Sequence, residues 1–338
     1  MVSGKVRNSG KTEWQISQAF CILENICLED FGMKVILAGG TGFIGQKIVQ
    51  RFVQEKQKCV LITRHPEQLK NLSSGFLRIE RWNANAPTLP KELIEQGDVI
   101  INLTGESLAS GRWTAETKKR LLNSRTATTD AIIRAIEKSG KKPAVLINAS
   151  AVGYYGHVPE SEVVEGNARG SDYLASLVGK WEASALEAEP LGVRVVLLRT
   201  GIVLDKSGGA LPRMMMPFRF YLGGWFGTGD QWFPWIHRED VVEIIFTIIN
   251  NSYITGPVNV VAPEHVTMKE FCLILSQVMG RPCWLPVPAG LLRLAVGDMA
   301  EMLLTGQRVI PKVMLDAGYR FKHPSLEDTL REIIGKGK

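Results

Sequence analysis

The 338-residue chain is predicted to fold as an α/β protein, a doubly wound parallel sheet with a smaller C-terminal substrate lobe. Two observations predict this class. Short apolar runs with the length of buried strands alternate along the chain with longer stretches of helical periodicity, which is the pattern of a parallel sheet covered on both faces. The first apolar run leads directly into a glycine-rich turn and a helix, as in a dinucleotide-binding unit.

The first predicted strand is Val35 to Ala38, and apolar residues at helical spacing follow from Gln46 to Gln54. Gly39, Gly42 and Gly45 lie between them. Glycines let the backbone turn sharply and let phosphate oxygens approach, while the helix N-terminus supplies free amide donors and a positive dipole. The predicted pyrophosphate cradle comprises Gly39, Thr41, Gly42, Phe43, Ile44 and Gly45.

The second predicted strand, Cys59 to Ile62, ends about 20 residues after the glycine turn, where such a unit usually places the group that contacts the adenosine ribose. Thr63 and Arg64 occupy this place, and no carboxylate does. A carboxylate would accept a hydrogen bond from a free ribose hydroxyl, whereas a hydroxyl beside a guanidinium suits a phosphate at that position. The sequence therefore predicts NADP(H) as the cofactor.

Four more strands are expected, at Val99 to Leu103, Ala144 to Asn148, Val193 to Leu198 and Val258 to Val261. The expected helices are Ala115 to Lys138, Tyr173 to Glu189, Arg238 to Asn250, Met268 to Met279 and Leu291 to Leu304. Cofactors in such sheets bind beyond the carboxyl ends of the strands. This rule places near the dinucleotide the residues that end two of these strands: Leu103, Thr104, Gly105 and Ser150.

The domain organisation follows from where the alternation begins and breaks. Residues 1–32 precede the first strand and are interpreted as an N-terminal extension that is either disordered or an appended helix, and a misassigned start codon would also explain it. Residues 33–204, completed by 236–262, form the predicted nucleotide-binding domain. Residues 205–235, rich in Gly, Pro, Met and aromatic side chains, and residues 263–338 form the predicted substrate lobe.

Composition and charge exclude several classes of partner. Hydrophobic residues make up 45% of the chain, but their runs stop well short of the ~18 residues of a membrane span, so we expect a cytoplasmic protein with no membrane partner. The net charge of +6 is spread along the chain without a nucleic-acid motif, so no nucleic acid is expected. No second His or Cys lies at ligand spacing from His237, so no metal is expected.

Several motifs together resemble the extended short-chain dehydrogenase/reductases, and within them an atypical branch of epimerase-family, cell-division-inhibitor-like proteins with that branch's C-terminal domain. The resemblance covers nearly all of residues 33–338. It rests on the glycine loop and on Asn102-Leu103-Thr104-Gly105-Glu106, Ser124-Arg125, Ser150-Ala151-Val152-Gly153-Tyr154-Tyr155-Gly156, Lys180-Trp181-Glu182, Arg199-Thr200-Gly201, Trp235-Ile236-His237-Arg238-Glu239-Asp240 and Leu304 to Pro311. It implies an extended Rossmann fold and NADP(H) bound by the glycine loop, Thr63, Arg64, Leu103, Thr104, Arg125 and Val203.

The chain departs from this family at the catalytic helix. Members that catalyse hydride transfer pair a Tyr with a Lys four residues later, and the Lys binds the nicotinamide ribose and lowers the pKa of the Tyr. Lys180 is present, but Ser176 stands four residues before it, and Tyr173 lies seven residues before it, about 10.5 Å along a helix. Lys180 is therefore expected to hold the ribose without the usual proton donor.

Two hypotheses for the site follow. In the first, Ser150 hydrogen-bonds a substrate carbonyl and Tyr154, or as second choice Tyr173, donates the proton; in the second, Tyr154 packs the substrate lobe and Ser150 caps a turn. The predicted function is an NADP(H)-binding oxidoreductase or epimerase-like protein acting on an unidentified small carbonyl or hydroxyl compound. The alternative is a noncatalytic NADP(H)-binding redox sensor or division-related regulator that contacts a protein partner.

Overall fold

The computed structural model describes residues 33–67, 75–82, 89–109 and 111–335. Lys34–Lys338 form one compact unit. The predictions for residues 1–32 lie outside the described part of the chain. Among the described residues, none of the helices combines the length and the apolar character that a membrane crossing requires.

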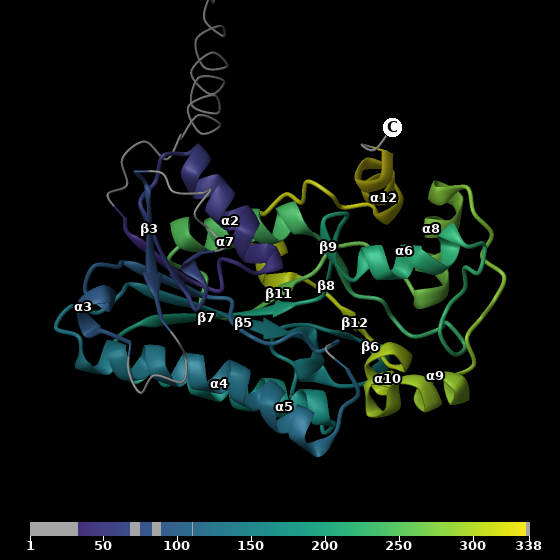
Figure 1. Ribbon diagram of the computed structural model, residues 1–338, viewed down its shortest axis with the longest axis horizontal. Coiled ribbons are helices and arrows are strands. Elements are labelled where there is room, and N and C mark those ends of the chain that lie inside the picture. The colour runs from purple at the N-terminus through teal and green to yellow at the C-terminus, as the bar shows by residue number, and fades with distance from the viewer. Residues whose placement is uncertain (1–32, 68–74, 83–88, 110, 336–338) are drawn as a thin grey trace, which may run out of the picture. The chain divides into compact units, whose positions relative to one another are not determined.

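The predicted doubly wound parallel sheet is confirmed (Figure 1). In spatial order its strands within the described residues are β11 (Gly256–Val260), β7 (Arg194–Thr200), β5 (Val145–Ala151), β4 (Val99–Asn102), β1 (Val35–Ala38), β2 (Cys59–Thr63) and β3 (Leu77–Arg81). Every neighbouring pair is parallel. The strand order reverses beside β1, and the crevice at such a reversal is where ligands of open α/β sheets bind.

Helices cover both faces of the sheet. Figure 1 shows α2 and α7 on one face and α4 and α5 on the other, where α4 and the sheet share a buried aliphatic core. The helical elements that lie along the chain between the strands of this sheet are α2 (Phe43–Gln54), α3 (Lys91–Ile94), α4 (Ala115–Lys138), η2 (Val152–Tyr155), α5 (Tyr173–Leu186), η3 (Glu189–Leu191) and α7 (Arg238–Asn250). Asp172 fixes the start of α5, since its side chain accepts from the Ala175 N–H at 2.8 Å.

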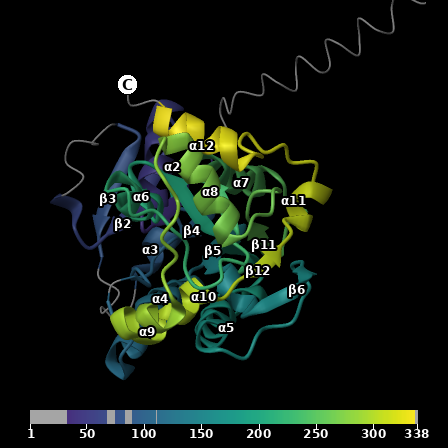
Figure 2. The same ribbon diagram turned by 90° about the vertical axis from the view of Figure 1, so that its right-hand side faces the viewer.

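The segments outside the seven-stranded sheet form a second lobe with smaller sheets and a hydrophobic core of its own, and Figure 2 is turned so that this side faces the viewer. Their elements are β8 (Ile202–Asp205), β9 (Gly208–Gly209), α6 (Leu211–Arg219), β10 (Trp235–His237), α8 (Met268–Met279), α9 (Ala289–Val296), η4 (Gly297–Met299), α10 (Ala300–Leu304), β12 (Gln307–Val309), α11 (Lys312–Asp316) and α12 (Leu326–Gly335). Strand β12 pairs in parallel with β6 (Val158–Val163). Buried Phe218, Trp235 and Phe271 lie in the core of this lobe, between α6, β10 and α8.

The sequence analysis missed or misplaced several elements, and three of them show why. Strand β3 escaped it because this strand lies at the sheet edge, and in it only Leu77 is buried. Helix α6 was missed because its Pro residues and Met run resemble a loop. The helix expected over Leu291 to Leu304 is instead two helices, broken at Gly297, whose φ of 63° lies in the left-handed region that ends a helix.

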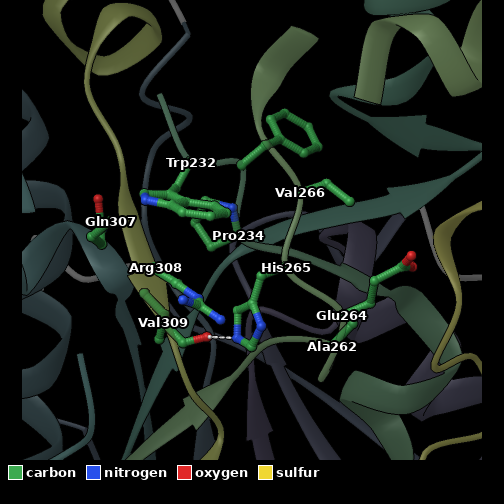
Figure 3. A pocket seen from close by; sticks show the side chains of 10 residues that line it. Trp232, Pro234, Ala262, Glu264, His265, Val266, Gln307, Arg308 and Val309 are labelled. Atoms are coloured by element: carbon green, nitrogen blue, oxygen red, sulfur yellow. Dashed lines mark hydrogen bonds between the residues drawn. The ribbon is translucent and has the colours of Figure 1, made fainter. Parts of the chain in front are cut away.

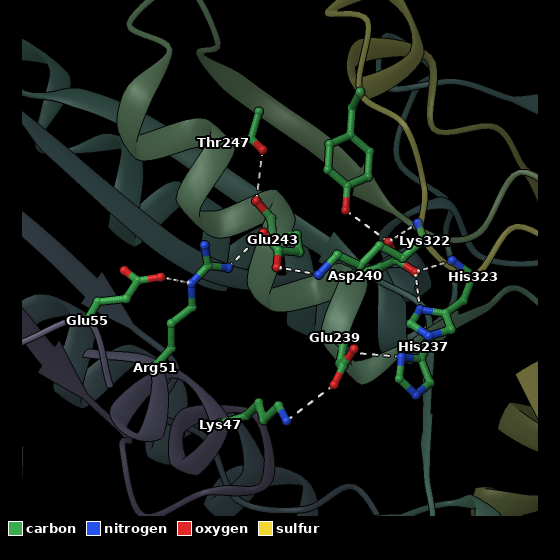
Figure 4. A network of polar contacts seen from close by, with 11 residues as sticks. Lys47, Arg51, Glu55, His237, Glu239, Asp240, Glu243, Thr247, Lys322 and His323 are labelled. Atoms are coloured by element: carbon green, nitrogen blue, oxygen red, sulfur yellow. Dashed lines mark hydrogen bonds and ion pairs between the residues drawn. The ribbon is translucent and has the colours of Figure 1, made fainter. Parts of the chain in front are cut away.

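A buried carboxylate joins α7 to the C-terminal segment (Figure 4). Asp240, fully buried, accepts hydrogen bonds from the Tyr319 hydroxyl at 2.9 Å, the Lys322 amide at 2.9 Å, and both the amide and Nδ1 of His323 at 3.0 Å. Although burial opposes the charge, these hydrogen bonds hold the pKa of Asp240 below its usual value. The segment before α12 is therefore held against the start of α7.

The fold also brings two histidines together that are far apart in the sequence. The rings of His237 and His323 lie 3.7 Å apart, and ligand atoms of His237, Glu239 and His323 come within 4.8 Å of one another, although no second histidine lies at ligand spacing from His237 in the sequence. These atoms have other partners: Nδ1 of His237 accepts from the Glu239 amide at 3.2 Å, and Glu239 pairs with Lys47. We interpret the cluster as structural.

The two imidazoles titrate in opposite directions. Burial, together with the charge of His323, lowers the pKa of His237 to about 4, whereas burial of His323 is outweighed by its hydrogen bond to Asp240, which raises the pKa of His323. Below pH 6.5 the unfolded chain protonates His237 and the folded chain does not, so stability falls from pH 6.5 to pH 4. The His323 contribution is lost only as pH rises through its folded pKa.

Replacement of His237 by Asn, which keeps a helix-capping side chain, should remove this pH dependence. Wild-type protein should lose roughly 2–3 kcal/mol more unfolding free energy than His237→Asn between pH 6.5 and pH 4. Urea unfolding at several pH values measures the difference, with exposed His65→Asn as the matched control. Parallel pH profiles for wild type and His237→Asn would contradict the assignment.

Candidate functional site

The glycine turn has the backbone geometry that a pyrophosphate cradle requires. Gly39 has a φ of 87°, and a Cβ on it would lie 2.8 Å from the Leu103 carbonyl carbon. A Cβ on Gly45 would lie 2.3 Å from the Gly39 oxygen, so the helix can approach the strand only without a side chain there. Gly42 caps α2 with no side chain over the first-turn amides, and no acidic residue lies in that turn. These features fit a bound anion.

The end of β2 presents the pair predicted to contact the ribose. Thr63 is buried, and its hydroxyl accepts from the His65 amide at 3.1 Å. Arg64 is exposed, with its guanidinium available to an anionic ligand. Arg81, at the end of β3 and in register with Thr63, adds a second cation, which pairs with Glu67 at 3.0 Å. Because Glu67 balances Arg81, the charge offered to a phosphate on the ribose is that of Arg64, for which no ion pair is found among the described residues.

Buried amides fix the ends of β4 and β5. Asn102 donates to the Asn148 side-chain oxygen at 2.7 Å and accepts from the Thr104 hydroxyl at 2.6 Å. The Leu103 amide donates to the Ala38 carbonyl at 2.9 Å. Leu103 and Thr104 thus stand directly beside the glycine turn, at the position predicted for them.

The Arg125 guanidinium is hydrogen-bonded to backbone carbonyls of the protein itself. It is buried behind Gly105, and its guanidinium donates to the carbonyls of Leu121 and Glu106 at 2.9 Å each. Burial lowers its pKa. The structure therefore shows Arg125 fastening the loop after β4 to α4, which positions Gly105.

A short hairpin, formed by β8 and β9, packs against the other side of the glycine turn. Val203 lies in β8, whose hairpin partner β9 packs on the Phe43 ring: a Cβ on either Gly208 or Gly209 would be 2.9 Å from that ring. The guanidinium of Arg238 lies 4.6 Å from the same ring centre. Phe43 of the cradle is thus covered by the segment that contains Val203.

The Ser150 hydroxyl is hydrogen-bonded to a buried ion pair. Its hydroxyl donates to Glu182 of α5 at 2.5 Å, and Arg199 of β7 binds both oxygens of the same carboxylate at 2.9 Å. Glu182 and Arg199 are 4% exposed, so their charges balance inside the protein. Burial would lower the pKa of Arg199, but the hydrogen bonds to Glu182 raise it. The Ser150 oxygen can then accept a hydrogen bond but has no proton left to donate.

The same arginine extends the network to the substrate lobe. Arg199 donates to the Tyr155 hydroxyl and to the Glu165 carbonyl at 3.0 Å each. The Tyr155 hydroxyl donates to Asn259 at 2.6 Å, and Glu165 accepts from the amides of Asn259 and Val313 at 3.1 Å each. Burial raises the pKa of Tyr155 to about 12, so it stays neutral.

The predicted catalytic residues do not assemble as expected. Lys180 is exposed, and it precedes buried Glu182 by two residues, which is about 200° around the helix. Lys180 therefore lies on the exposed side of α5, and its expected role at the nicotinamide ribose stays a prediction. The Tyr173 hydroxyl donates to the Lys118 carbonyl at 3.2 Å, and burial raises its pKa.

Tyr154 keeps a free hydroxyl. Its half-buried ring lies on the Arg199 guanidinium, 3.5 Å from centre to carbon, and edge-on to Tyr155. Among the hydrogen bonds of the described residues, none engages the Tyr154 hydroxyl. Tyr154 also joins an apolar wall at the carboxyl ends of β4 and β5, together with Leu108, Trp113, Ala151, Tyr173, Leu174, Met299 and Met302.

A separate small pocket lies between the β10 region and β12 (Figure 3). Its open space of about 190 Å³ is below the ~300–1,000 Å³ of typical ligand sites. His265 contacts the Val309 carbonyl at 3.1 Å, and Arg308 stacks on Trp232 and pairs with Glu162. None of the residues that line this pocket belongs to the glycine turn.

Glu182, Arg199, Tyr155 and Glu165 were missed as site residues, since no local pattern links them, although the first three stand in the motifs of the resemblance. Arg199→Met leaves Glu182 buried without its counter-ion and should cost about 3–5 kcal/mol of unfolding free energy. The double variant Glu182→Gln/Arg199→Met should lose less than the single one, because no uncompensated charge remains.

Urea unfolding measures these losses, and Arg293→Met serves as the control because Arg293 and Glu301 form an exposed pair worth about 0–1 kcal/mol. Additive losses in the double variant would show that the buried pair is not coupled.

Comparison with known proteins places the chain in a family. A model of the NAD dependent epimerase/dehydratase family matches residues 35–261, and one of a domain of unknown function (DUF1731) matches residues 287–333. Epimerase family protein YfhF of Bacillus subtilis (strain 168) is 37% identical over 307 residues, which cover 90% of this chain and 99% of that protein. Epimerase family protein SDR39U1 homolog, chloroplastic, of Arabidopsis thaliana is 36% identical, over 89% of this chain and 87% of that protein.

Solved structures agree. The human epimerase family protein SDR39U1 (isoform2) with NADPH has a TM-score of 0.79 and 33% identity, over 90% of this chain and 99% of that one. UDP-glucuronic acid 4-epimerase from Bacillus cereus has a TM-score of 0.71 at 16% identity, over 90% of this chain and 99% of that one, which shows the fold alone. The resemblance expected from the motifs is confirmed, and the chain belongs to the NAD dependent epimerase/dehydratase family.

Proposed function

We propose that the protein is an NADP(H)-dependent oxidoreductase that acts on a small carbonyl or hydroxyl compound of apolar character. The observation that carries this proposal is Tyr154: its ring is held on Arg199, its hydroxyl is free among the described residues, and it stands in η2 directly after β5. A phenol at the carboxyl edge of the sheet is placed where a proton donor must act.

The cofactor assignment rests on two supports. The glycine turn fits a pyrophosphate, and Thr63 with exposed Arg64 fits a ribose phosphate. The human SDR39U1 structure, 33% identical, is described with NADPH. In this protein Leu103 and Thr104 would border the same cofactor, and Arg125 would hold the adjoining loop in place.

The chain's own groups then have defined roles. A bound NADPH would supply the hydride. Tyr154 would donate the proton to the carbonyl oxygen. Because the Ser150 hydroxyl donates its hydrogen bond to Glu182, the Ser150 oxygen would act towards the substrate only as a hydrogen-bond acceptor. The apolar cluster around Trp113 and Met299 would border the substrate and favour one of apolar character.

A sugar nucleotide fits this site less well. Its diphosphate would need several converging cations. Arg308 pairs with Glu162 and Lys312 with Asp316, while Arg213 and Arg219 stand exposed on α6, so these four cations come from three elements and two are already paired.

A second candidate is a noncatalytic NADP(H)-binding sensor that contacts a protein partner. The observation that favours it is the dispersal of the usual catalytic groups: Lys180 faces solvent, Ser150 is bound to Glu182, and the Tyr173 hydroxyl is bound to a backbone carbonyl. Tight NADPH binding with no turnover of any compound in a broad carbonyl panel would favour this candidate.

The role of Arg64 can be tested by reversing its charge. Arg64→Asp should raise the NADPH dissociation constant about 10–100-fold, because a charge-assisted hydrogen bond is replaced by repulsion, and should leave NADH affinity unchanged or improved. Fluorescence titration with both cofactors measures this, with Arg78→Asp, on β3 and paired with Glu80, as the control. An unchanged NADPH constant would remove the assignment.

The proton donor can be tested with paired Tyr to Phe variants. Tyr154→Phe should lower kcat for NADPH-dependent carbonyl reduction by about 10²–10⁴-fold with little change in NADPH affinity. Tyr173→Phe, which loses only a bond to a backbone carbonyl, should change kcat little. Equal activity of wild type and Tyr154→Phe would exclude Tyr154 as the donor.

A further inference from the structure

Large apolar side chains gather on one surface of the substrate lobe, where water would be expected to meet polar groups. This aromatic patch comprises Phe220, Tyr221, Leu222, Trp284 and Leu285, which are 66%, 54%, 51%, 60% and 40% exposed. Single exposed apolar residues are ordinary, but contiguous ones mark interaction sites. The patch joins two segments far apart in sequence, the end of α6 and the chain after α8 (Figure 1).

Backbone contacts hold the patch rigid. The amides of Trp284 and Leu285 both donate to the Gly223 carbonyl, at 2.9 and 3.0 Å, and Gly223 bridges Cys283 in parallel. A Cβ on Gly224 would lie 1.8 Å from the Leu285 oxygen, so the two segments approach as closely as glycine permits. The side chains are therefore presented by a fixed platform and not by a loose loop.

Tyr221 is held in an unfavourable backbone conformation. Its φ is 63°, which side chains other than glycine rarely adopt. The Trp284 indole donates to the Tyr221 carbonyl at 2.9 Å, and Arg281 donates to the Tyr221 hydroxyl at 2.9 Å. Strain that the surrounding structure maintains is common at binding sites. In this protein the strained backbone at Tyr221 keeps the aromatic ring of that residue at the surface.

The charged residues in the two segments that carry the patch are all cationic. Residues 206–229 and 271–297 contain no Asp or Glu, and their cations are Lys206, Arg213, Arg219, Arg281 and Arg293. Arg293 pairs with Glu301 of α10, whereas Arg213 and Arg219 stand exposed on α6 beside the patch. The surface is thus apolar, aromatic and cationic.

This chemistry discriminates between occupants. A second copy would set arginines against arginines. A nucleic acid would use the aromatic rings and arginines but gains nothing from exposed aliphatic Leu222 and Leu285. A lipid bilayer with anionic headgroups uses all three properties, because Trp and Tyr favour the headgroup region, Leu and Phe enter the acyl boundary, and arginines bind the phosphates.

We propose that the aromatic patch docks the protein on an anionic lipid bilayer surface. The contact is peripheral, through side chains and not through a spanning helix, and it revises the expectation that no membrane takes part. It does not depend on the proposed reaction, since none of the patch residues lies in the cradle or carries the proton.

Vesicle cosedimentation tests the proposal. Full-length protein should bind phosphatidylcholine vesicles that contain about 30 mol% phosphatidylserine much more than pure phosphatidylcholine vesicles, and high salt should weaken the binding. Phe220→Ser/Leu222→Ser and Arg213→Gln/Arg219→Gln should each lower the partition coefficient by about tenfold or more. Tyr253→Ser, at a 94% exposed tyrosine outside the patch, is the matched control and should bind as wild type.

Thermal unfolding and NADPH titration of each variant verify that fold and cradle are intact, so that lost binding reports the surface. No binding to either vesicle, equal binding to both, or binding unaffected by the patch variants would overturn the proposal. A dimer that Phe220→Ser/Leu222→Ser dissolves, without vesicle binding, would identify a second copy as the occupant and likewise overturn it.

Discussion

The buried ion pair between Glu182 and Arg199 is the interaction on which the geometry of the site depends. Both charges are nearly inaccessible to water, so each must find its hydrogen bonds inside the protein. Glu182 finds them in Ser150 and Arg199, and Arg199 in Glu182, Tyr155 and a backbone carbonyl. These bonds fix α5, β5, β7 and η2 relative to one another, and they determine which groups at the carboxyl edge remain free for chemistry.

The parts of the fold that local sequence could predict are those determined locally. The run before Gly39 is apolar throughout because β1 is buried on both faces, and the glycines are needed wherever a Cβ would strike backbone. Strand β3 could not be predicted in this way, since an edge strand buries little and shows no apolar run. The break at Gly297 was visible as a glycine, but its left-handed backbone was not.

The site was harder to predict because its contacts are distant in sequence. Ser150 was identified from its place after a strand, yet its partner Glu182 lies 32 residues away, and Tyr155 meets Asn259 across 104 residues. Lys180 was predicted from its spacing in a family pattern. That spacing does not show which face of the helix is buried, and in the structure the buried face contains Glu182 and not Lys180. His323 reaches His237 only through the C-terminal segment.

The pairing of β12 with β6 has a consequence for how this chain can be divided. The Ile310 amide donates to the Val163 carbonyl at 2.8 Å, and Gln307 donates to the Val152 carbonyl at 2.6 Å. The partners therefore come from the region matched by the epimerase/dehydratase family and from the region matched by the domain of unknown function. A family boundary in this chain is not a folding boundary: a protein cut between Ala262 and Val287 would leave Val158–Val163 with a bare strand edge, open to pairing with other molecules.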